Sequence, residues 1–217
     1  MAGTGEAVNN RDVILHKVRT ALGRAVGQAP APAPAALLKC LAVDAPDREA
    51  RIASFIQQFE ALAGKAVRTP TCAAAGDWLR RFLDGKTWVA AHSPFLAECG
   101  IATEMMGTDD LRARCAESSV GITSVDYALA DTGSFVMLSS KKQPRLVSLL
   151  PPVHVAIFPS TAILSGLDEL FTLLPNPAEQ TSSMVLITGP SRTADIEQML
   201  VRGVHGPGEI YAVIVGQ

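Results

Sequence analysis

The chain has 217 residues, of which 48% are hydrophobic and 18% are charged, and its formal net charge is −2. This length predicts one folded domain with an appendage, because domains usually span about 100–200 residues. The near-neutral charge argues against non-specific nucleic-acid binding, which requires a basic surface. A small molecule or a protein is therefore the expected partner.

The sequence shows no targeting signal and no spacing typical of a metal site. The first residues, MAGTGEAVNNRD, lack the layout of a signal peptide, and no apolar run approaches the ~18 residues of a membrane helix. We therefore expect a cytoplasmic protein without a membrane span. Its four cysteines form no CxxC pair and its four histidines no HxxxH or HxH pair, so we expect isolated reduced thiols and no metal or cofactor in this chain.

The N-terminal segment predicts a helix followed by a linker. Residues 12–26 place Ile14, Val18 and Leu22 on one apolar stripe, and Asp12 is a candidate cap. Packing on its own domain, docking on a partner and binding to a membrane surface are the alternatives for this helix. Alternating Pro and Ala over 28–36 favour extended backbone. We therefore divide the chain into a helix and linker over 1–36 and a main domain over 37–217.

From residue 47 onward, helical and strand patterns alternate. Helices are predicted over 47–63, 72–84, after Ser93-Pro94, and over 109–116, with strands over 65–68 and 87–91. Strands 125–130 and 134–139 flank Asp131-Thr132-Gly133, which indicates a hairpin with a left-handed Gly133. A helical turn over 145–150, a strand over 153–158, a helix over 165–174, a strand over 184–187, a helix over 191–202 and a strand over 210–215 complete the prediction.

The runs VHVAIF, MVLI and IYAVIV are almost continuously apolar. Such runs are typical of strands that are buried on both faces, as in parallel sheets covered by helices. Alternation of strands with helices favours the same architecture, and the hairpin adds antiparallel strands. The expected fold is α/β, with a helix-flanked mixed, largely parallel sheet.

Polar residues that follow the strand over 184–187 form the first candidate site. Ligands of open α/β sheets bind beyond the carboxyl ends of the strands, and a helix start offers free N–H groups to an anion. Ordinary helix capping is the alternative, but it does not need the forked guanidinium of an arginine. The candidate anion-binding residues are Gly189, Ser191, Arg192 and Thr193.

The hairpin turn forms a second candidate site. Asp131 offers a carboxylate for proton transfer or for binding a ligand hydroxyl, with Thr132, Gly133 and Ser134 beside it. A tight turn between apolar strands uses the same residue types without any function, so both interpretations stay open.

Three further residues have alternative roles. His205, within the glycine-rich segment 203–208, is either an acid–base or ligand-binding residue or part of a turn. Arg145 is either a second anion contact or a surface charge. His154 lies inside an apolar run and is expected to be a core residue.

Three segments together carry a family resemblance. The sequences GITSVDYALADTGSFVMLSS, QPRLVSLLPPVHVAIFPSTAI and SSMVLITGPSRTADIEQMLVRGVHGPGEIYAVIV resemble the lactate utilization protein C (LutC/YkgG) family, of the LUD (DUF162) group. The resemblance covers about residues 121–215, and ITGPSRTADIE…GVHGP is its most specific part. It implies a fold similar to the NagB/RpiA/CoA-transferase group. CoA transferases carry a catalytic Glu in that fold, and Asp131 stands at the matching turn.

The resemblance also implies a pathway. It predicts a subunit that supports oxidation of L-lactate to pyruvate beside iron–sulfur partner proteins, with a small carboxylate or another anion as ligand. In this interpretation the partners carry the clusters, Asp131 and His205 are the catalytic candidates, and the subunit's own reaction stays open. The alternatives are a stand-alone isomerase or CoA-transferase-type enzyme and a non-catalytic assembly or regulatory subunit.

Overall fold

A computed structural model describes residues 9–25, 27–28, 47–102, 108–194 and 200–216. The chain divides into two units, residues 1–39 and 40–217, which are described separately. In the first unit, α1 (Asn10–Ala21) is capped by Asn9, whose side chain accepts the Arg11 N–H. No residue of α1 is buried, and Asp12, the predicted cap, lies in its first turn. The predicted linker lies, beyond Gln28, outside the described residues.

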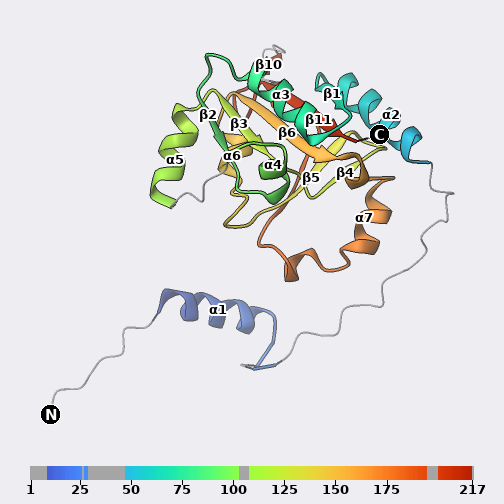
Figure 1. Ribbon diagram of the computed structural model, residues 1–217. Helices are drawn as coiled ribbons and strands as arrows, with labels where there is room; N and C mark the ends of the chain where they lie inside the picture. Colours follow the sequence, from blue (N-terminus) through green and yellow to red (C-terminus); the bar gives the residue numbers. More distant parts are fainter. Residues whose placement is uncertain (1–8, 26, 29–46, 103–107, 195–199, 217) are drawn as a thin grey trace. The chain divides into compact units, whose positions relative to one another are not determined.

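The second unit is built around a five-stranded sheet with the order β1-β11-β6-β3-β2 (Figure 1). All four strand pairs are parallel. The apolar runs predicted from the sequence form the centre of this sheet, where β6 and β11 are buried along most of their length. The strands are β1 (Lys65–Thr69), β2 (Trp88–Ala90), β3 (Val120–Thr123), β6 (Val153–Pro159) and β11 (Glu209–Val215).

The predicted hairpin lies in a second sheet, with the order β7-β4-β5-β8. Strands β4 and β5 pair antiparallel, as do β5 and β8, whereas β4 and β7 are parallel. The hairpin therefore lies in a separate mixed sheet, and the central sheet is parallel. Its strands are β4 (Tyr127–Leu129), β5 (Ser134–Leu138), β7 (Ile163–Leu164) and β8 (Met184–Ile187).

Different layers cover the two faces of the central sheet. On one face, α3 (Cys72–Phe82) and α4 (Pro94–Glu98) pack on side chains that include Ile157 and Val213 (Figure 1). On the other face, α2 (Arg48–Ala61) and the inner side of the second sheet enclose stacked and edge-on rings. The centroids of these rings lie 5.1–6.0 Å apart where they contact, and the rings are those of Phe55, Phe59, Phe135 and Phe158.

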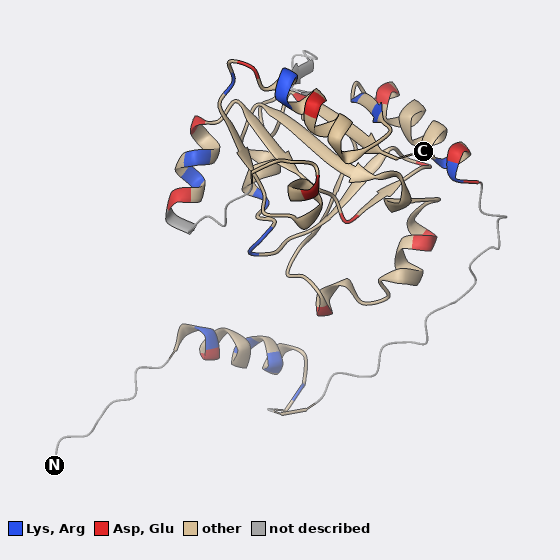
Figure 2. Cartoon of the chain, viewed as in Figure 1, with Lys and Arg blue, Asp and Glu red and all other residues tan. Residues whose placement is uncertain are grey.

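Shorter elements complete the domain. Helices α5 (Thr108–Glu117) and α6 (Leu146–Leu149) pack together beside β2, and α7 (Leu167–Leu173) packs on the outer side of the second sheet. Two 3₁₀ turns, η1 (Ser160–Ala162) and η2 (Pro177–Glu179), join neighbouring elements. Lys, Arg, Asp and Glu residues are found mainly on the helices and loops (Figure 2). The predicted α/β fold with a largely parallel, helix-flanked sheet is thereby confirmed.

The helix predicted over 191–202 is wrong for the residues that the structure describes. Arg192–Ala194 form β9 and Leu200–Arg202 form β10, and the two pair antiparallel. Residues 195–199 lie outside the described residues. The reason lies at Ser191, whose N–H donates to the Pro207 carbonyl at 2.9 Å and whose carbonyl accepts the Gly203 N–H at 3.0 Å. These distant partners hold the backbone extended where a helix would have to start.

Candidate functional site

Three hydroxyl groups meet where the second sheet's hairpin turns, and we call Thr132, Ser134 and Thr188 the hydroxyl cluster. The Ser134 hydroxyl donates to Thr132 Oγ1 at 2.9 Å and lies 2.9 Å from Thr188 Oγ1. The pairing of Phe135 with Ile187 explains this contact, because it places the start of β5 beside the end of β8. Two loops that the sequence identified separately are thus brought together.

The C-terminal end of α2 packs against both loops. Gly133 has φ +63°, as predicted for the hairpin, and a Cβ there would collide with the backbone nitrogen of Phe59. An L-residue would be strained by that φ as well as by the contact, so only glycine suits this position. On the second loop, a Cβ on Gly189 would lie 3.1 Å from the carbonyl oxygen of Leu62, the C-cap residue of α2.

Arg192 is anchored on the same helix end. Its Nη2 donates to the Leu62 carbonyl at 2.5 Å, although 130 residues separate the two. A cation is favourable there because the C-terminus of a helix carries partial negative charge. The predicted helix start that would have offered N–H groups to an anion is absent among the described residues here. Binding of an anion by Arg192 and Ser191 stays a prediction, and the side chain of Thr193 lies outside the description.

The loop that carries His205 joins this region through Ser191. Besides the two Ser191 hydrogen bonds, the Gly208 N–H donates to the Pro152 carbonyl at 3.0 Å. Because Pro152 precedes β6 and Gly208 precedes β11, the loop lies at the amino ends of these parallel strands. His205 itself is exposed.

Asp131 contacts the segment that precedes α7. Its N–H donates to the Ser165 carbonyl at 3.2 Å, and its carboxylate lies against Gly166, where a Cβ would come 2.5 Å from Oδ2. Among the described residues, no hydrogen bond or ion pair joins Asp131 to His205. The two candidate catalytic residues therefore do not form a hydrogen-bonded pair in this structure.

Arg145 lies at the opposite end of β8 from the hydroxyl cluster. Its Nη1 is 3.4 Å from the hydroxyl of Ser183, which directly precedes β8. The structure therefore places Arg145 at the other end of β8 from the loop of Arg192, and its role as a second anion contact stays a prediction.

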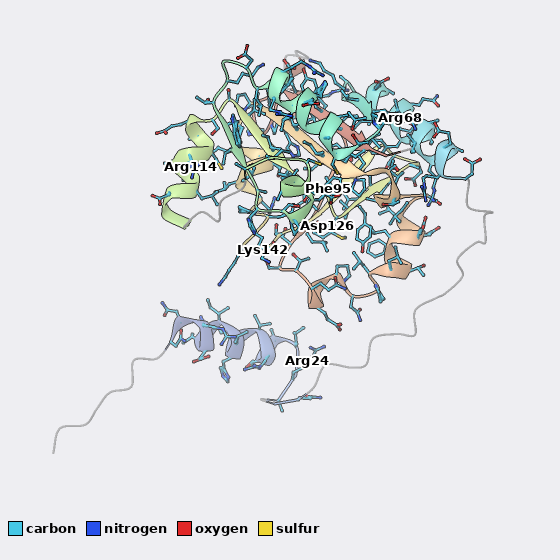
Figure 3. The ribbon with its side chains drawn as sticks, viewed as in Figure 1. Arg24, Arg68, Phe95, Arg114, Asp126 and Lys142 are labelled. Carbon is cyan, nitrogen blue, oxygen red and sulfur yellow. The ribbon has the colours of Figure 1, made fainter. Side chains whose placement is uncertain are left out.

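Asp126 is a polar residue near that same sheet end which the sequence analysis missed. Asp126 is labelled in Figure 3. Its Oδ2 accepts the Leu138 N–H at 2.7 Å, and burial raises the pKa of this carboxyl. Within the described part of the chain, the nearby Ser139 Oγ and Gln143 Oε1 are buried without a hydrogen-bond partner. The only sequence signal was one acid near the start of the strand predicted over 125–130, and a single acid at such a place does not by itself indicate a site.

His154 is confirmed as a core residue. It is fully buried, its ring packs edge-on against Phe135, and its Nε2 lies 2.8 Å from the hydroxyl oxygen of Thr123. Burial lowers the pKa of His154 to about 3, so the imidazole is neutral at physiological pH. Nδ1 finds no partner among the residues that the structure describes.

The described residues bring together no group of three or more His, Cys, Asp or Glu side chains that could hold a metal ion. Cys40 is not among them. No described helix is long and apolar enough to span a bilayer. What the region around Arg192 offers chemically is one forked cation, the hydroxyl cluster and the Ser191 hydroxyl on neighbouring loops.

Comparison with known proteins decides the family. Residues 52–215 match the model of the LUD domain. The chain belongs to the LUD domain family. This confirms the resemblance found in the sequence and extends it N-terminally to α2. A crystal structure of a DUF162 family protein from Deinococcus radiodurans is similar in fold, with a TM-score of 0.59 at 15% identity, and the match covers 79% of this chain and 99% of that one.

Curated LUD relatives carry a common name. Lactate utilization protein C of Macrococcus caseolyticus is 34% identical over 140 residues, which cover 63% of this chain and 58% of that protein. The protein of the same name from Bacillus subtilis is 39% identical over 103 residues, covering 46% and 43%. The matched part thus spans about half the length of these relatives.

Proposed function

We propose that this LUD protein takes part in lactate utilization, as a subunit that supports oxidation of L-lactate to pyruvate beside iron–sulfur partner proteins. The observation that carries the proposal is the similarity to lactate utilization protein C of several bacteria, at 34–39% identity. The match to the LUD domain model supports the same family, and the matched residues 52–215 contain every candidate site residue.

The region around Arg192 suits the chemistry of a small hydroxy acid. A guanidinium binds a carboxylate well because it offers several N–H donors in one plane. In the described contacts of Arg192, the Leu62 carbonyl accepts from one guanidinium nitrogen, Nη2. Hydroxyl groups of the hydroxyl cluster and of Ser191 both donate and accept, as binding of a 2-hydroxyl or 2-keto group requires. Thr132, Thr188 and Arg192 are exposed, so a ligand reaches them from solvent.

The iron–sulfur part of the proposal comes from the family resemblance, and it is consistent with electron balance. Oxidation of L-lactate to pyruvate releases two electrons and two protons, and the electrons need an acceptor. Iron–sulfur clusters accept electrons one at a time and are held by cysteine thiolates. The cysteines of this chain show no cluster-binding spacing, so the proposal assigns the clusters to partner proteins.

Growth on L-lactate tests the proposal. An in-frame deletion, in a host without another lactate dehydrogenase, is expected to abolish growth on L-lactate and to leave growth on pyruvate intact. Reintroduction of the wild-type chain should restore growth, whereas a chain with Arg192→Ala and Ser191→Ala should not. Normal growth of the deletion strain on L-lactate would refute the proposed function.

The partner part is tested separately. The tagged full chain, purified from lactate-grown cells, is expected to bring down proteins that contain iron and acid-labile sulfide in comparable amounts. If the chain elutes alone while the deletion strain still fails on lactate, the role in lactate utilization stands and the iron–sulfur partners are removed from it.

A further inference from the structure

Two cysteines that are far apart in the sequence meet on the face of the central sheet that α3 and α4 cover. Cys72 is the first residue of α3, and Gly76 lies one helical turn further on the same side of that helix. Cys99 is the C-cap residue that follows α4, and its carbonyl oxygen packs so closely on Gly76 that a Cβ there would collide with it. The backbone at Cys99 therefore lies against the side of α3 that carries Cys72.

The two side chains lie in one packed layer. Cys99 belongs to the apolar cluster that includes Ala75 and Leu96, and Cys72 packs against that cluster. The Cys72 thiol is also close enough to raise the pKa of the Cys99 thiol. Both are free thiols. A disulfide requires Cβ atoms about 3.5–4.5 Å apart. The close approach of the Cys99 backbone to α3 brings the two cysteines toward that range.

The two thiols differ in their access to solvent. Cys99 is buried, with 3% of its surface exposed, whereas Cys72 is half-buried. Burial, together with the contact to Cys72, raises the pKa of the Cys99 thiol to about 12. A soluble oxidant therefore meets Cys72 first, and Cys99 stays a thiol until its neighbour has reacted.

We propose that Cys72 and Cys99 are a redox modification site, in which a hydroperoxide oxidises Cys72 and Cys99 then closes a reversible disulfide. In the first step the peroxide O–O bond breaks, the Cys72 sulfur becomes a sulfenic acid and one water leaves. In the second step the Cys99 sulfur attacks the Cys72 sulfur, the S–O bond breaks and hydroxide leaves with the Cys99 proton as a second water. Two thiols and one hydrogen peroxide thus give one disulfide and two waters, and a dithiol reverses the change.

The disulfide would join α3 to α4 on the face of the central sheet opposite the hydroxyl cluster. Because a cross-link restrains the unfolded chain, the oxidised protein should unfold at a higher temperature than the reduced one. This inference is independent of the proposed role in lactate utilization.

The test uses the full chain with Cys40→Ser and Cys115→Ala, so that only the proposed pair can react. After treatment with hydrogen peroxide and alkylation under denaturing conditions, mass spectrometry should show one peptide pair linked through Cys72 and Cys99 and no alkylated thiol. Dithiothreitol should return both thiols. The unmodified chain, mapped in the same way, gives the same answer if the double variant does not fold.

Single variants separate the two steps. With Cys99→Ser, Cys72 should stop at the sulfenic acid and be captured by dimedone. With Cys72→Ser, Cys99 should remain an unmodified thiol because it is buried. The proposal is overturned if both thiols of the folded protein are still alkylated after peroxide treatment, or if Cys72 forms its linkage with Cys40 or Cys115.

Discussion

The hydroxyl oxygens of Ser134 and Thr188 lie 2.9 Å apart, although 54 residues separate them in the chain. Ser134 is buried, and its hydroxyl also donates to Thr132 Oγ1 at 2.9 Å. One small side chain thus connects the hairpin turn to the loop that carries Arg192. This contact joins the two parts of the candidate site, and its contribution is measurable.

Ser134→Ala is expected to lower the free energy of unfolding by about 1 kcal/mol, the usual contribution of a hydrogen bond of this kind. Thr188→Val should cost a similar amount. Because both changes remove the same contact, the double variant should lose less than the sum of the single losses. Urea unfolding measures all three, with the exposed Ser182→Ala as a control that should change little. Strict additivity would contradict a direct Ser134–Thr188 interaction.

Gly76→Ala should destabilise the protein, although alanine has a higher helix propensity than glycine. In an exposed helix interior, alanine is favoured over glycine by about 1 kcal/mol. At Gly76, however, the new Cβ would collide with the Cys99 carbonyl, and α4 would have to move away from α3. Thermal and urea unfolding should both show the loss.

The matched control for Gly76→Ala is the reverse change at an exposed position of the same helix. Ala73→Gly is expected to lower the free energy of unfolding by no more than about 1 kcal/mol, because only propensity changes there. A stabilising Gly76→Ala would mean that α3 and α4 are not in close contact, and it would also weaken the proposed Cys72–Cys99 pair.

Local patterns predicted most of the fold, and contacts between distant segments account for what they missed. The apolar runs at β6 and β11 predicted these strands because strands buried on both faces are apolar throughout. Asp131-Thr132-Gly133 predicted the hairpin because a tight turn needs a glycine in the left-handed conformation. The helix expected after Ser191 failed because that residue bonds to the 203–208 loop, which no local pattern records.

The candidate site was predictable to a similar degree. Polar residues after predicted strands identified the two loops of the hydroxyl cluster. The sequence could not show that these loops contact each other, because the contact depends on the register of β5 with β8. The anchoring of Arg192 on Leu62 and the pairing of Cys72 with Cys99 are likewise tertiary contacts. Short strands β3 and β7 were missed because their few residues show no distinct period.

His154 predicts a loss of stability below neutral pH. The folded protein holds this imidazole neutral down to a pKa of about 3, whereas the unfolded chain binds a proton below about pH 6.5. The unfolded state therefore gains protons first as the pH falls, and stability decreases between about pH 6.5 and 3. From pH 7 to pH 5 the contribution is about 2 kcal/mol, at about 1.4 kcal/mol for each pH unit below 6.5.

His154→Gln should reduce this difference between pH 7 and pH 5 by about 2 kcal/mol in urea unfolding, whatever its effect on stability at pH 7. Thr123→Val is the control, because it removes the hydrogen bond to Nε2 and leaves a buried neutral imidazole. It should keep the wild-type pH dependence. An unchanged pH dependence in His154→Gln would show that His154 is not the group responsible.

Arg192→Ala separates a structural role from a functional one. The guanidinium is exposed and bonds the Leu62 carbonyl at the end of α2, so its loss should cost no more than about 1 kcal/mol of unfolding free energy. If Arg192 also binds the ligand's carboxylate, the variant should fold and yet fail to restore growth on L-lactate to the deletion strain. Arg192→Lys keeps the charge but loses the planar fork, and intermediate growth is expected. Lys141→Ala, an exposed change in another loop, should restore growth fully. Full growth with stable Arg192→Ala would leave Arg192 only its structural contact with α2.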